Sequence, residues 1–387
     1  MLNIKTYNKI SAYGLAEFDK SKYEVGEDVT DPLGAIVRSA ALHDVEFPSS
    51  LLAIARAGAG TNNIPIARCS EEGIVVFNTP GANANAVKEL VVAGLLLASR
   101  RVIPAIEWAK TLKGNGAEVG KMVEKGKSAF AGPEISGKKL GIIGLGAIGV
   151  LVANAANHLG MKVYGYDPYL SVNSAWNLSH NVTRAYDIKE IYETCDYISI
   201  HVPLTPDTKG FINSDAIAAM KDGVRILNFA RGELVDSASI LGALDSGKVS
   251  AYVTDFPNDD VIGAEGVIAI PHLGASTPES EDNCAKMAAQ ELIDYIENGN
   301  ILNSVNLPSI SMPRSGEVRI CVIHKNVPNI LSKITGIISA DNVNIENMLN
   351  KSKGDYAYTM IDINSSDVEK LSNDIKNVEE VIRVRVI

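Results

Sequence analysis

Residues 139–167, KLGIIGLGAIGVLVANAANHLGMKVYGYD, decide the fold. The apolar run 140–143 is typical of a buried parallel strand. It leads into G-L-G-A-I-G, with glycines at 144, 146 and 149, and then into an apolar helical pattern and a second strand at 162–166. Glycines at this spacing allow a tight turn, close approach of the backbone to a pyrophosphate and close packing of helix on strand. The stretch therefore predicts a dinucleotide-binding βαβ unit.

The second strand ends in Asp167, which follows Gly149 by 18 residues (167 − 149). That is close to the separation of about 20 expected of a carboxylate that binds the adenine ribose diol. A carboxylate here also repels a 2′-phosphate, which favours NAD over NADP. The unpaired N–H groups at the start of the helix attract the phosphates. The predicted cofactor contacts in this unit are Gly144, Gly146, Ala147, Ile148, Gly149 and Asp167.

Composition and charge narrow the possible partners. The formal net charge of −10 argues against nucleic acid or an acidic membrane surface. The four cysteines form no C-x-x-C pair and the six histidines show no metal-ligand spacing. We therefore expect reduced thiols, no metal site and a cytoplasmic location. The sequence contains neither a signal-peptide pattern nor an apolar stretch long enough to span a bilayer.

Strands alternate with helices on both sides of the glycine-rich turn, and polar residues follow most of the strands. The polar, glycine-rich stretch 111–132 is expected to be a surface loop. Residues 307–316 (LPSISMPRSG) have the composition of a linker. The order βαββαβ after it predicts a ferredoxin-like module whose edge strands could pair with a second copy. The predicted α/β fold has a discontinuous flavodoxin-like substrate domain (1–98 and 281–306), an NAD-binding Rossmann domain (99–280), a linker (307–316) and the C-terminal module (317–387).

Ordered motifs link the chain to a known family. The segments GKKLGIIGLGAIG, YDPY, HVPLTPDT, NFARGELVD and PHLGASTPESEDNCA occur in that order, after VRSA, AGAGTNN and NTPGANANAVKEL. They resemble the D-isomer-specific 2-hydroxyacid dehydrogenases, in particular the phosphoglycerate-oxidising members that carry a C-terminal ACT domain. The resemblance implies oxidation of 3-phospho-D-glycerate to 3-phosphohydroxypyruvate with NAD, the first step of L-serine biosynthesis. The alternatives are a glyoxylate or hydroxypyruvate reductase of the same family, or an NAD-sensing binding protein like the corepressors built on this fold.

The family's catalytic roles fall on three positions. Arg231 would bind the substrate carboxylate and keto oxygen through its guanidinium group. His272 would be the general acid–base that takes the hydroxyl proton. A glutamate that orients this histidine in the family is replaced here by Asp260, one methylene shorter, and Asp259 and Glu265 are rivals for that role.

The resemblance also implies binding residues. The further cofactor contacts are His201, Pro203, Thr208, Ala230, Asp255, Gly274 and Ala275, with Val87 nearby. The substrate contacts are Arg38 and Ser39 for the phosphate, the backbone of Ala59 and Gly60 for the carboxylate, and Asn78.

In serine-regulated relatives the ACT domain binds its effector through a histidine and asparagines. His324, Asn326 and Asn344 stand at the matching places, although Asn329 replaces the usual glycine of the loop. Asparagine tolerates the left-handed conformation, so the turn can survive. A serine effector and a purely dimerising role remain alternatives, and the family implies at least a homodimer.

Overall fold

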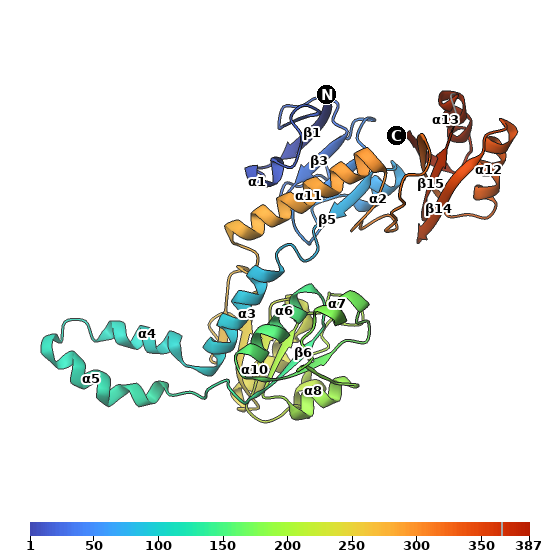
Figure 1. Ribbon diagram of the computed structural model, residues 1–387. Helices are drawn as coiled ribbons and strands as arrows, with labels where there is room; N and C mark the ends of the chain where they lie inside the picture. Colours follow the sequence, from blue (N-terminus) through green and yellow to red (C-terminus); the bar gives the residue numbers. More distant parts are fainter. Residues whose placement is uncertain (365–366) are drawn as a thin grey trace. The chain divides into compact units, whose positions relative to one another are not determined.

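The computed structural model describes residues 1–364 and 367–387 and divides them into two compact units (Figure 1). Unit 1 contains residues 1–83 and 278–387, and unit 2 contains residues 84–277. The chain therefore passes between the units at 83/84 and 277/278, whereas the sequence suggested 98/99 and 280/281. The exact domain boundaries stay predictions. In the described residues, no helix combines the length and the apolar character needed to cross a membrane.

Unit 2 is built on a seven-stranded parallel sheet in the order β12-β11-β10-β9-β6-β7-β8. The strand order reverses between β6 and β9, and ligands of open α/β sheets bind at such a point, beyond the carboxyl ends of the strands. This arrangement confirms the predicted Rossmann-type α/β class. The strands are β6 (Lys139–Ile143), β7 (Lys162–Tyr166), β8 (Thr183–Arg184), β9 (Tyr197–Ile200), β10 (Val224–Asn228), β11 (Val249–Thr254) and β12 (Val267–Ala269).

Helices cover both faces of this sheet because its central strands are mainly apolar and buried. All four residues of β9 are buried. One hydrophobic cluster joins the sheet to α3 and α6, and another joins it to α8, α9 and α10. The helices are α3 (Ala84–Ser99), α6 (Ala147–His158), α7 (Val172–Asn177), α8 (Ile188–Thr194), α9 (Ser214–Ala219) and α10 (Ser237–Asp245).

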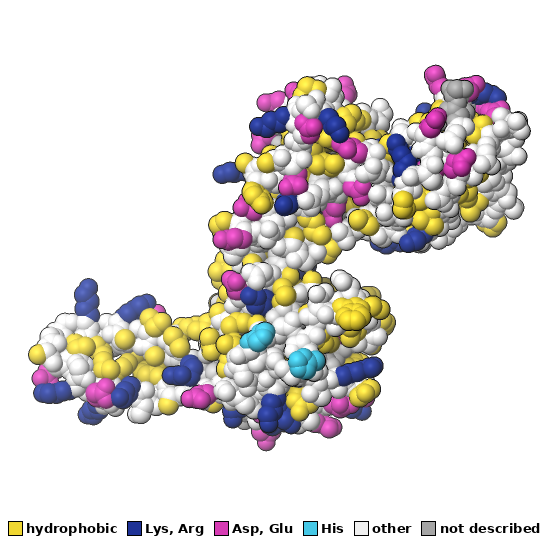
Figure 2. All heavy atoms as spheres, viewed as in Figure 1, with side chains coloured by type: hydrophobic (Ala, Val, Ile, Leu, Met, Phe, Trp, Pro, Cys, Tyr) yellow, Lys and Arg dark blue, Asp and Glu magenta, His cyan; other side chains and the backbone are white. Residues whose placement is uncertain are grey.

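A helical arm lies between α3 and β6. It consists of α4 (Val102–Thr111) and α5 (Val119–Gly126), and neither helix has a buried residue. Figure 2 shows hydrophobic side chains between the two helices and Lys and Arg around the outside. The expectation of a loop over 111–132 was therefore wrong for α5. Contacts that join the two sides of the arm, such as Trp108 with Phe130 (ring centroids 5.2 Å apart), outweigh its glycines and polar residues.

The first part of unit 1 is a five-stranded parallel sheet in the order β2-β1-β3-β4-β5. Helices α1 and α11 pack on one face and α2 on the other. The sheet places the ends of β3, β4 and β5 side by side. These elements are β1 (Leu2–Tyr7), β2 (Tyr23–Gly26), β3 (Gly34–Val37), β4 (Ala53–Arg56), β5 (Val75–Asn78), α1 (Ala12–Leu15), α2 (Ile66–Glu71) and α11 (Pro278–Asn298).

The C-terminal module (317–387) is an antiparallel sheet in the order β14-β15-β13-β16. Alternate residues of β13 face opposite ways: Ile320 and Val322 pack under the module's own helices, whereas Cys321 and Ile323 join the core of the parallel-sheet part of unit 1. Both faces of this sheet are therefore covered. The elements are β13 (Val318–Lys325), α12 (Ile330–Ala340), β14 (Ile345–Lys353), β15 (Tyr356–Ile363), α13 (Val368–Lys376) and β16 (Val381–Val386).

The C-terminal module also supplies the hydrogen-bond donors that helix α11 needs at its end. The last carbonyls of a helix have no partner within the helix. Arg385 donates to the carbonyls of Tyr295 and Ile296, at 3.2 and 3.0 Å. Arg319 donates to the carbonyl of Asn298 at 2.8 Å, and its guanidinium pairs with the buried Asp362. The module is thus bonded to the final turn of α11.

Candidate functional site

The three glycines of the glycine-rich turn differ in the space beside them, and among the described residues only Gly146 faces open space. Gly144 has a φ of +93°, and a Cβ atom there would lie 2.6 Å from the carbonyl oxygen of His201. A Cβ on Gly149 would lie 2.0 Å from the carbonyl oxygen of Gly144, so α6 packs tightly on the turn. A Cβ on Gly146, in contrast, would meet no described atom within 4 Å. Gly146 is the N-cap residue directly before α6, and no side chain of the described residues caps the helix, so its first N–H groups can receive a pyrophosphate.

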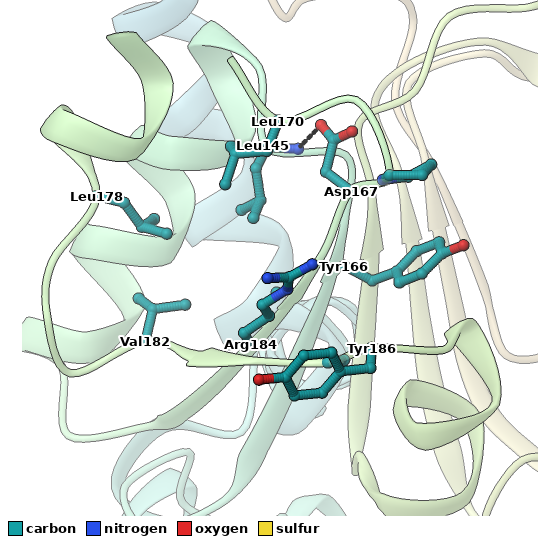
Figure 3. Close-up of a pocket in the computed structure, with 11 residues that line it drawn as sticks. Leu145, Tyr166, Asp167, Leu170, Leu178, Val182, Arg184 and Tyr186 are labelled. Carbon is teal, nitrogen blue, oxygen red and sulfur yellow. Dashed lines mark hydrogen bonds between the residues drawn. The ribbon is translucent and has the colours of Figure 1, made fainter. Parts of the chain in front are cut away.

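Asp167 lies beside this turn and holds it in place. Its Oδ2 accepts a hydrogen bond from the backbone N–H of Leu145 at 2.8 Å, and its Oδ1 accepts one from Tyr169 at 2.8 Å. Figure 3 shows the carboxylate at one end of a pocket of about 510 Å³, with Arg184 and Tyr186 along another side. These two side chains stack, with the guanidinium carbon 4.7 Å from the ring centroid. A pocket with a carboxylate, an aromatic ring and aliphatic walls fits an adenosine.

His201, Pro203 and Thr208 follow β9 at the same edge of the sheet. Thr208 Oγ1 donates to the carbonyl of Pro203 at 2.7 Å, which closes the turn after the strand. The Nε2 atom of His201 is 2.8 Å from the hydroxyl of Ser199. Burial lowers the pKa of His201 to about 4, so the ring is neutral at pH 7. This histidine is therefore suited to positioning and not to acid–base chemistry near neutrality.

Arg231 and His272 converge on one ring. The guanidinium carbon of Arg231 is 5.6 Å from the centroid of Phe256, and the imidazole centroid of His272 is 4.6 Å from the same centroid. Both side chains are exposed to solvent. Asn228, buried at the end of β10, accepts from the N–H of Ala230 and donates to the carbonyl of Arg231. The sequence analysis missed Phe256 and Asn228 because their contacts depend on the folded loop.

Asp255 fixes the segment that carries His272. Its two carboxylate oxygens accept hydrogen bonds from the N–H groups of Leu273 (2.7 Å) and Gly274 (2.8 Å). Burial raises the pKa of Asp255, and these two hydrogen bonds and the charge of His272 oppose the rise. Val87 packs against Gly274, since a Cβ on this glycine would lie 3.4 Å from its side chain. His272 itself has a φ of +52°, an uncommon conformation for a residue other than glycine.

The partner of His272 stays a prediction. Among the described residues, no hydrogen bond is found between His272 and any of Asp260, Asp259 or Glu265. Asp260 lines a pocket of about 710 Å³ together with Glu233 and Asp236. Glu265 lines a different pocket, near the base of the arm.

The predicted substrate residues lie in unit 1 at the ends of β3, β4 and β5. Asn78 Nδ2 donates to the carbonyl of Ala59 at 2.6 Å, and the N–H of Ser39 donates to Asn8 Oδ1 at 3.3 Å. The guanidinium of Arg38 pairs with Glu281, with Nη2 and Oε1 2.6 Å apart. Gly60 lies in the same loop as Ala59.

Arg56 is a candidate that the sequence analysis missed. It ends β4, next to the end of β3, and its Nε donates to the carbonyl of Arg38 at 3.1 Å. Burial raises the pKa of the Cys284 thiol, and the charges of Arg56 and Arg38 both oppose this rise, so both guanidinium groups lie near one thiol. A signal was present in the sequence: arginine follows the apolar residues of two successive strands.

The three predicted effector residues do not hydrogen-bond to one another within the described parts of the chain. His324 is buried, with Nδ1 2.8 Å from the carbonyl oxygen of Lys325 and Nε2 2.9 Å from the hydroxyl of Thr359. Asn326 donates to the carbonyl of Gly354, and Asn344 donates to Glu346. Asn329 adopts the left-handed conformation with a φ of +67°, as expected. In the residues that the structure describes, no group of three or more His, Cys, Asp and Glu side chains could hold a metal ion.

Two family models match the chain. The NAD binding domain of the D-isomer specific 2-hydroxyacid dehydrogenases matches residues 92–274, and an AHAS small subunit-like ACT domain matches residues 320–383. Both matches agree with the resemblance derived from the motifs. NAD is therefore the cofactor of the family to which unit 2 is similar.

Curated relatives and a solved structure extend the match. The chain is 35% identical over 355 residues to D-3-phosphoglycerate dehydrogenase of Haemophilus influenzae, covering 89% of this chain and 83% of the relative. It is 32% identical over 356 residues to the enzyme of the same name from Escherichia coli K12, with the same coverage. The NAD⁺-bound 3-phosphoglycerate dehydrogenase of Entamoeba histolytica superposes with a TM-score of 0.59 at 27% identity, covering 79% of this chain and 98% of that one. The chain belongs to the D-isomer specific 2-hydroxyacid dehydrogenase family.

Proposed function

We propose that this enzyme oxidises 3-phospho-D-glycerate to 3-phosphohydroxypyruvate with NAD, the first step of L-serine biosynthesis. The observation that carries the proposal is the convergence of Arg231 and His272 on Phe256, at the carboxyl edge of the NAD-binding sheet. A cation and an imidazole are the two groups that oxidation of a 2-hydroxy acid requires from the protein. The names of the relatives support the choice of substrate.

Different residues of unit 2 bind the substrate, transfer its proton and hold the catalytic side chains in place. Bound NAD supplies the hydride acceptor. The guanidinium of Arg231 binds the substrate carboxylate and polarises the developing carbonyl oxygen. His272 accepts the proton of the substrate hydroxyl as the carbon loses its hydride, and returns it in the reverse reaction. Asp255 and Asn228 keep the backbones that carry these side chains in place. Asp260 is retained as a candidate to orient the imidazole.

The residues of unit 1 suit an anionic substrate. Arg38 and Arg56 end neighbouring strands, and the loop with Ala59 and Gly60 follows the second of them. Guanidinium groups bind phosphate and carboxylate through paired N–H donors. We therefore assign the substrate phosphate to Arg38 with Ser39. We assign the substrate carboxylate to the backbone of residues 59–60, with Arg56 and Asn78 beside it.

Three finer assignments belong to the same proposal. The ACT domain binds an amino-acid effector, for which serine is the first choice. The enzyme is at least a homodimer, which the exposed arm supports because Val102, Ile103 and Ile106 are each at least 41% exposed. The location is cytoplasmic, which the four free and buried cysteines support.

A direct assay tests the reaction. The full-length protein is mixed with NAD and 3-phospho-D-glycerate, and the formation of NADH is followed by its absorbance. Steady turnover with 3-phosphohydroxypyruvate as product is expected. NAD binding without turnover of any 2-hydroxy acid would support the corepressor-like alternative and reject the enzyme.

A glyoxylate or hydroxypyruvate reductase remains the second candidate, and one contact favours it: Arg38 is already paired with Glu281. Arg38→Ala separates the two candidates. It should lower kcat/KM for 3-phospho-D-glycerate by about 10- to 100-fold, since a charged hydrogen bond is lost. The value for glyoxylate should change less than twofold. Equal losses for both substrates would contradict the assignment of the phosphate to Arg38.

A further inference from the structure

The carboxylate of Glu281 already forms an ion pair with Arg38, the residue to which we assign the substrate phosphate. Glu281 Oε1 lies 2.6 Å from Arg38 Nη2, and the two side chains are each 42% exposed. Glu281 belongs to the first turn of α11, and Arg38 directly follows β3. The two residues are 243 positions apart in the sequence, so only the fold of unit 1 brings them together.

The surroundings hold both partners in place. The carbonyl of Arg38 accepts hydrogen bonds from Arg56 Nε (3.1 Å) and from Asn63 Nδ2 (3.5 Å), which fixes the backbone from which the guanidinium extends. The next residue of α11, Asp282, accepts a hydrogen bond from the hydroxyl of Ser11, which fixes the first turn of the helix. The N-terminal position of Glu281 in the helix also stabilises its negative charge.

The pair must change when a phosphate arrives. A phosphate monoester carries nearly two negative charges at pH 7 and seeks the same guanidinium N–H groups that Glu281 contacts. The phosphate must displace the carboxylate or remain beside it, and like charges at such distances repel. An exposed ion pair is weak, so displacement is possible but carries an energetic penalty. An acid without a phosphate does not meet this penalty at Arg38.

We propose that Glu281 is a specificity-determining residue that competes with the substrate phosphate for Arg38 and weakens the binding of phosphorylated acids relative to unphosphorylated ones. Its carboxylate returns to the guanidinium when the phosphorylated ligand leaves. This inference rests on the proposed function, because it assumes that the phosphate binds at Arg38.

The test compares Glu281→Gln with the wild type on 3-phospho-D-glycerate and on D-glycerate, which lacks only the phosphate. KM for the phosphorylated acid should fall by about three- to tenfold with kcat unchanged, since the competing charge is removed. KM for D-glycerate should stay within twofold. Glu279→Gln serves as the matched control, because Glu279 lies in the same exposed turn and makes no ion pair with Arg38. The control should leave both KM values unchanged.

A double-mutant cycle assigns the effect to Arg38. In an Arg38→Ala background, Glu281→Gln should no longer change KM for the phosphorylated acid. Unchanged KM in the single variant, equal changes for both acids, or the same effect without Arg38 would each overturn the proposal.

Calorimetric titration with 3-phospho-D-glycerate separates this proposal from the proposed function. If the wild type binds the compound but does not oxidise it, the reaction assignment fails, and the Kd values of the two proteins still test Glu281. A Kd for Glu281→Gln that is not lower than that of the wild type would overturn the inference even if turnover is normal.

Discussion

The two units offer different kinds of anion-binding group at the ends of their parallel strands. In unit 2 the turn at 144–149 offers backbone N–H groups, and the space for a phosphate exists because Gly146 has no side chain. In unit 1 the ends of β3 and β4 offer the side chains of Arg38 and Arg56. The first site depends on backbone geometry and the second on side-chain charges.

The difference determines how each site can be adjusted. At the glycine-rich turn a side chain added at Gly146 would enter the space left for a phosphate, so the NAD site is sensitive to volume. A guanidinium can form an ion pair with a neighbouring carboxylate, as Arg38 does with Glu281. Its ability to bind a substrate anion then depends on that carboxylate. Substitutions that add side-chain volume at the turn should therefore weaken cofactor binding, whereas substitutions that change charge near Arg38 should alter substrate binding.

The largest effect is expected from His272→Ala in unit 2. Loss of a general acid–base lowers kcat by about 10²- to 10⁴-fold. The Kd of NAD should remain within threefold, because the glycine-rich turn and Asp167 are untouched. Stopped-flow measurement of turnover and calorimetric titration with NAD provide the two values. Wild-type kcat in this variant would show that the proton is transferred by another group.

Two glycine variants compare fold and ligand at the same turn. Gly149→Ala should both unfold the turn and abolish NAD binding, because its Cβ would lie 2.0 Å from a backbone oxygen. Gly146→Ala should keep the wild-type Tm, since its Cβ meets no described atom within 4 Å, but should weaken NAD binding by about tenfold or more through contact with the pyrophosphate. Thermal unfolding with and without NAD distinguishes the two variants. Undiminished NAD affinity in Gly146→Ala would mean that the phosphates lie elsewhere.

In unit 1, Arg385→Ala tests how strongly the C-terminal module is joined to α11. The variant loses two hydrogen bonds to the carbonyls of Tyr295 and Ile296 and a contact with the Tyr295 ring at 4.4 Å. The free energy of unfolding of unit 1 should fall by about 1–3 kcal/mol. Denaturant unfolding measures this, with Lys376→Ala on α13 as the control. Equal stability of the two variants would show that the module is joined weakly.

The smallest effect at pH 5 is expected from Glu291→Gln on α11, and this effect grows as the pH rises. Burial raises the pKa of Glu291 from 4.5 to about 8, opposed by a hydrogen bond from Asn303. The folded protein then binds more protons than the unfolded chain between these pH values, so stability falls as pH rises from about 5 to 8. The glutamine variant should lose this pH dependence and gain about 4 kcal/mol at pH 8, with a change below about 1 kcal/mol at pH 5. Tm values across this range test it, with Glu297→Gln as the control. If the Tm of the wild type and that of Glu291→Gln changed with pH in the same way, the pKa of Glu291 would not be raised in the folded protein.

The sequence was most informative where function depends on neighbours in the chain. The turn at 144–149 and the position of Asp167 were predicted from local spacing, and in the structure Asp167 accepts a hydrogen bond from Leu145 of that turn. Their contacts with NAD stay predictions. The α5 helix was missed because its glycines and polar residues favoured a loop, although its apolar residues recur with helical periodicity. Arg56, Phe256 and Glu281 were not predicted because their roles depend on contacts between distant residues. Asp260 stays a prediction, because the one-methylene difference cannot be resolved by spacing alone.

Helix α11 has its two ends engaged by different parts of unit 1. Its last turn is bonded to the C-terminal module, and its first turn carries the carboxylate that contacts Arg38. At 21 residues the helix is about 30 Å long and has no proline after its first residue, so it can move as a stiff rod. A small rotation of the module would therefore shift the carboxylate at the far end, and an effector could alter substrate affinity without any contact with the substrate.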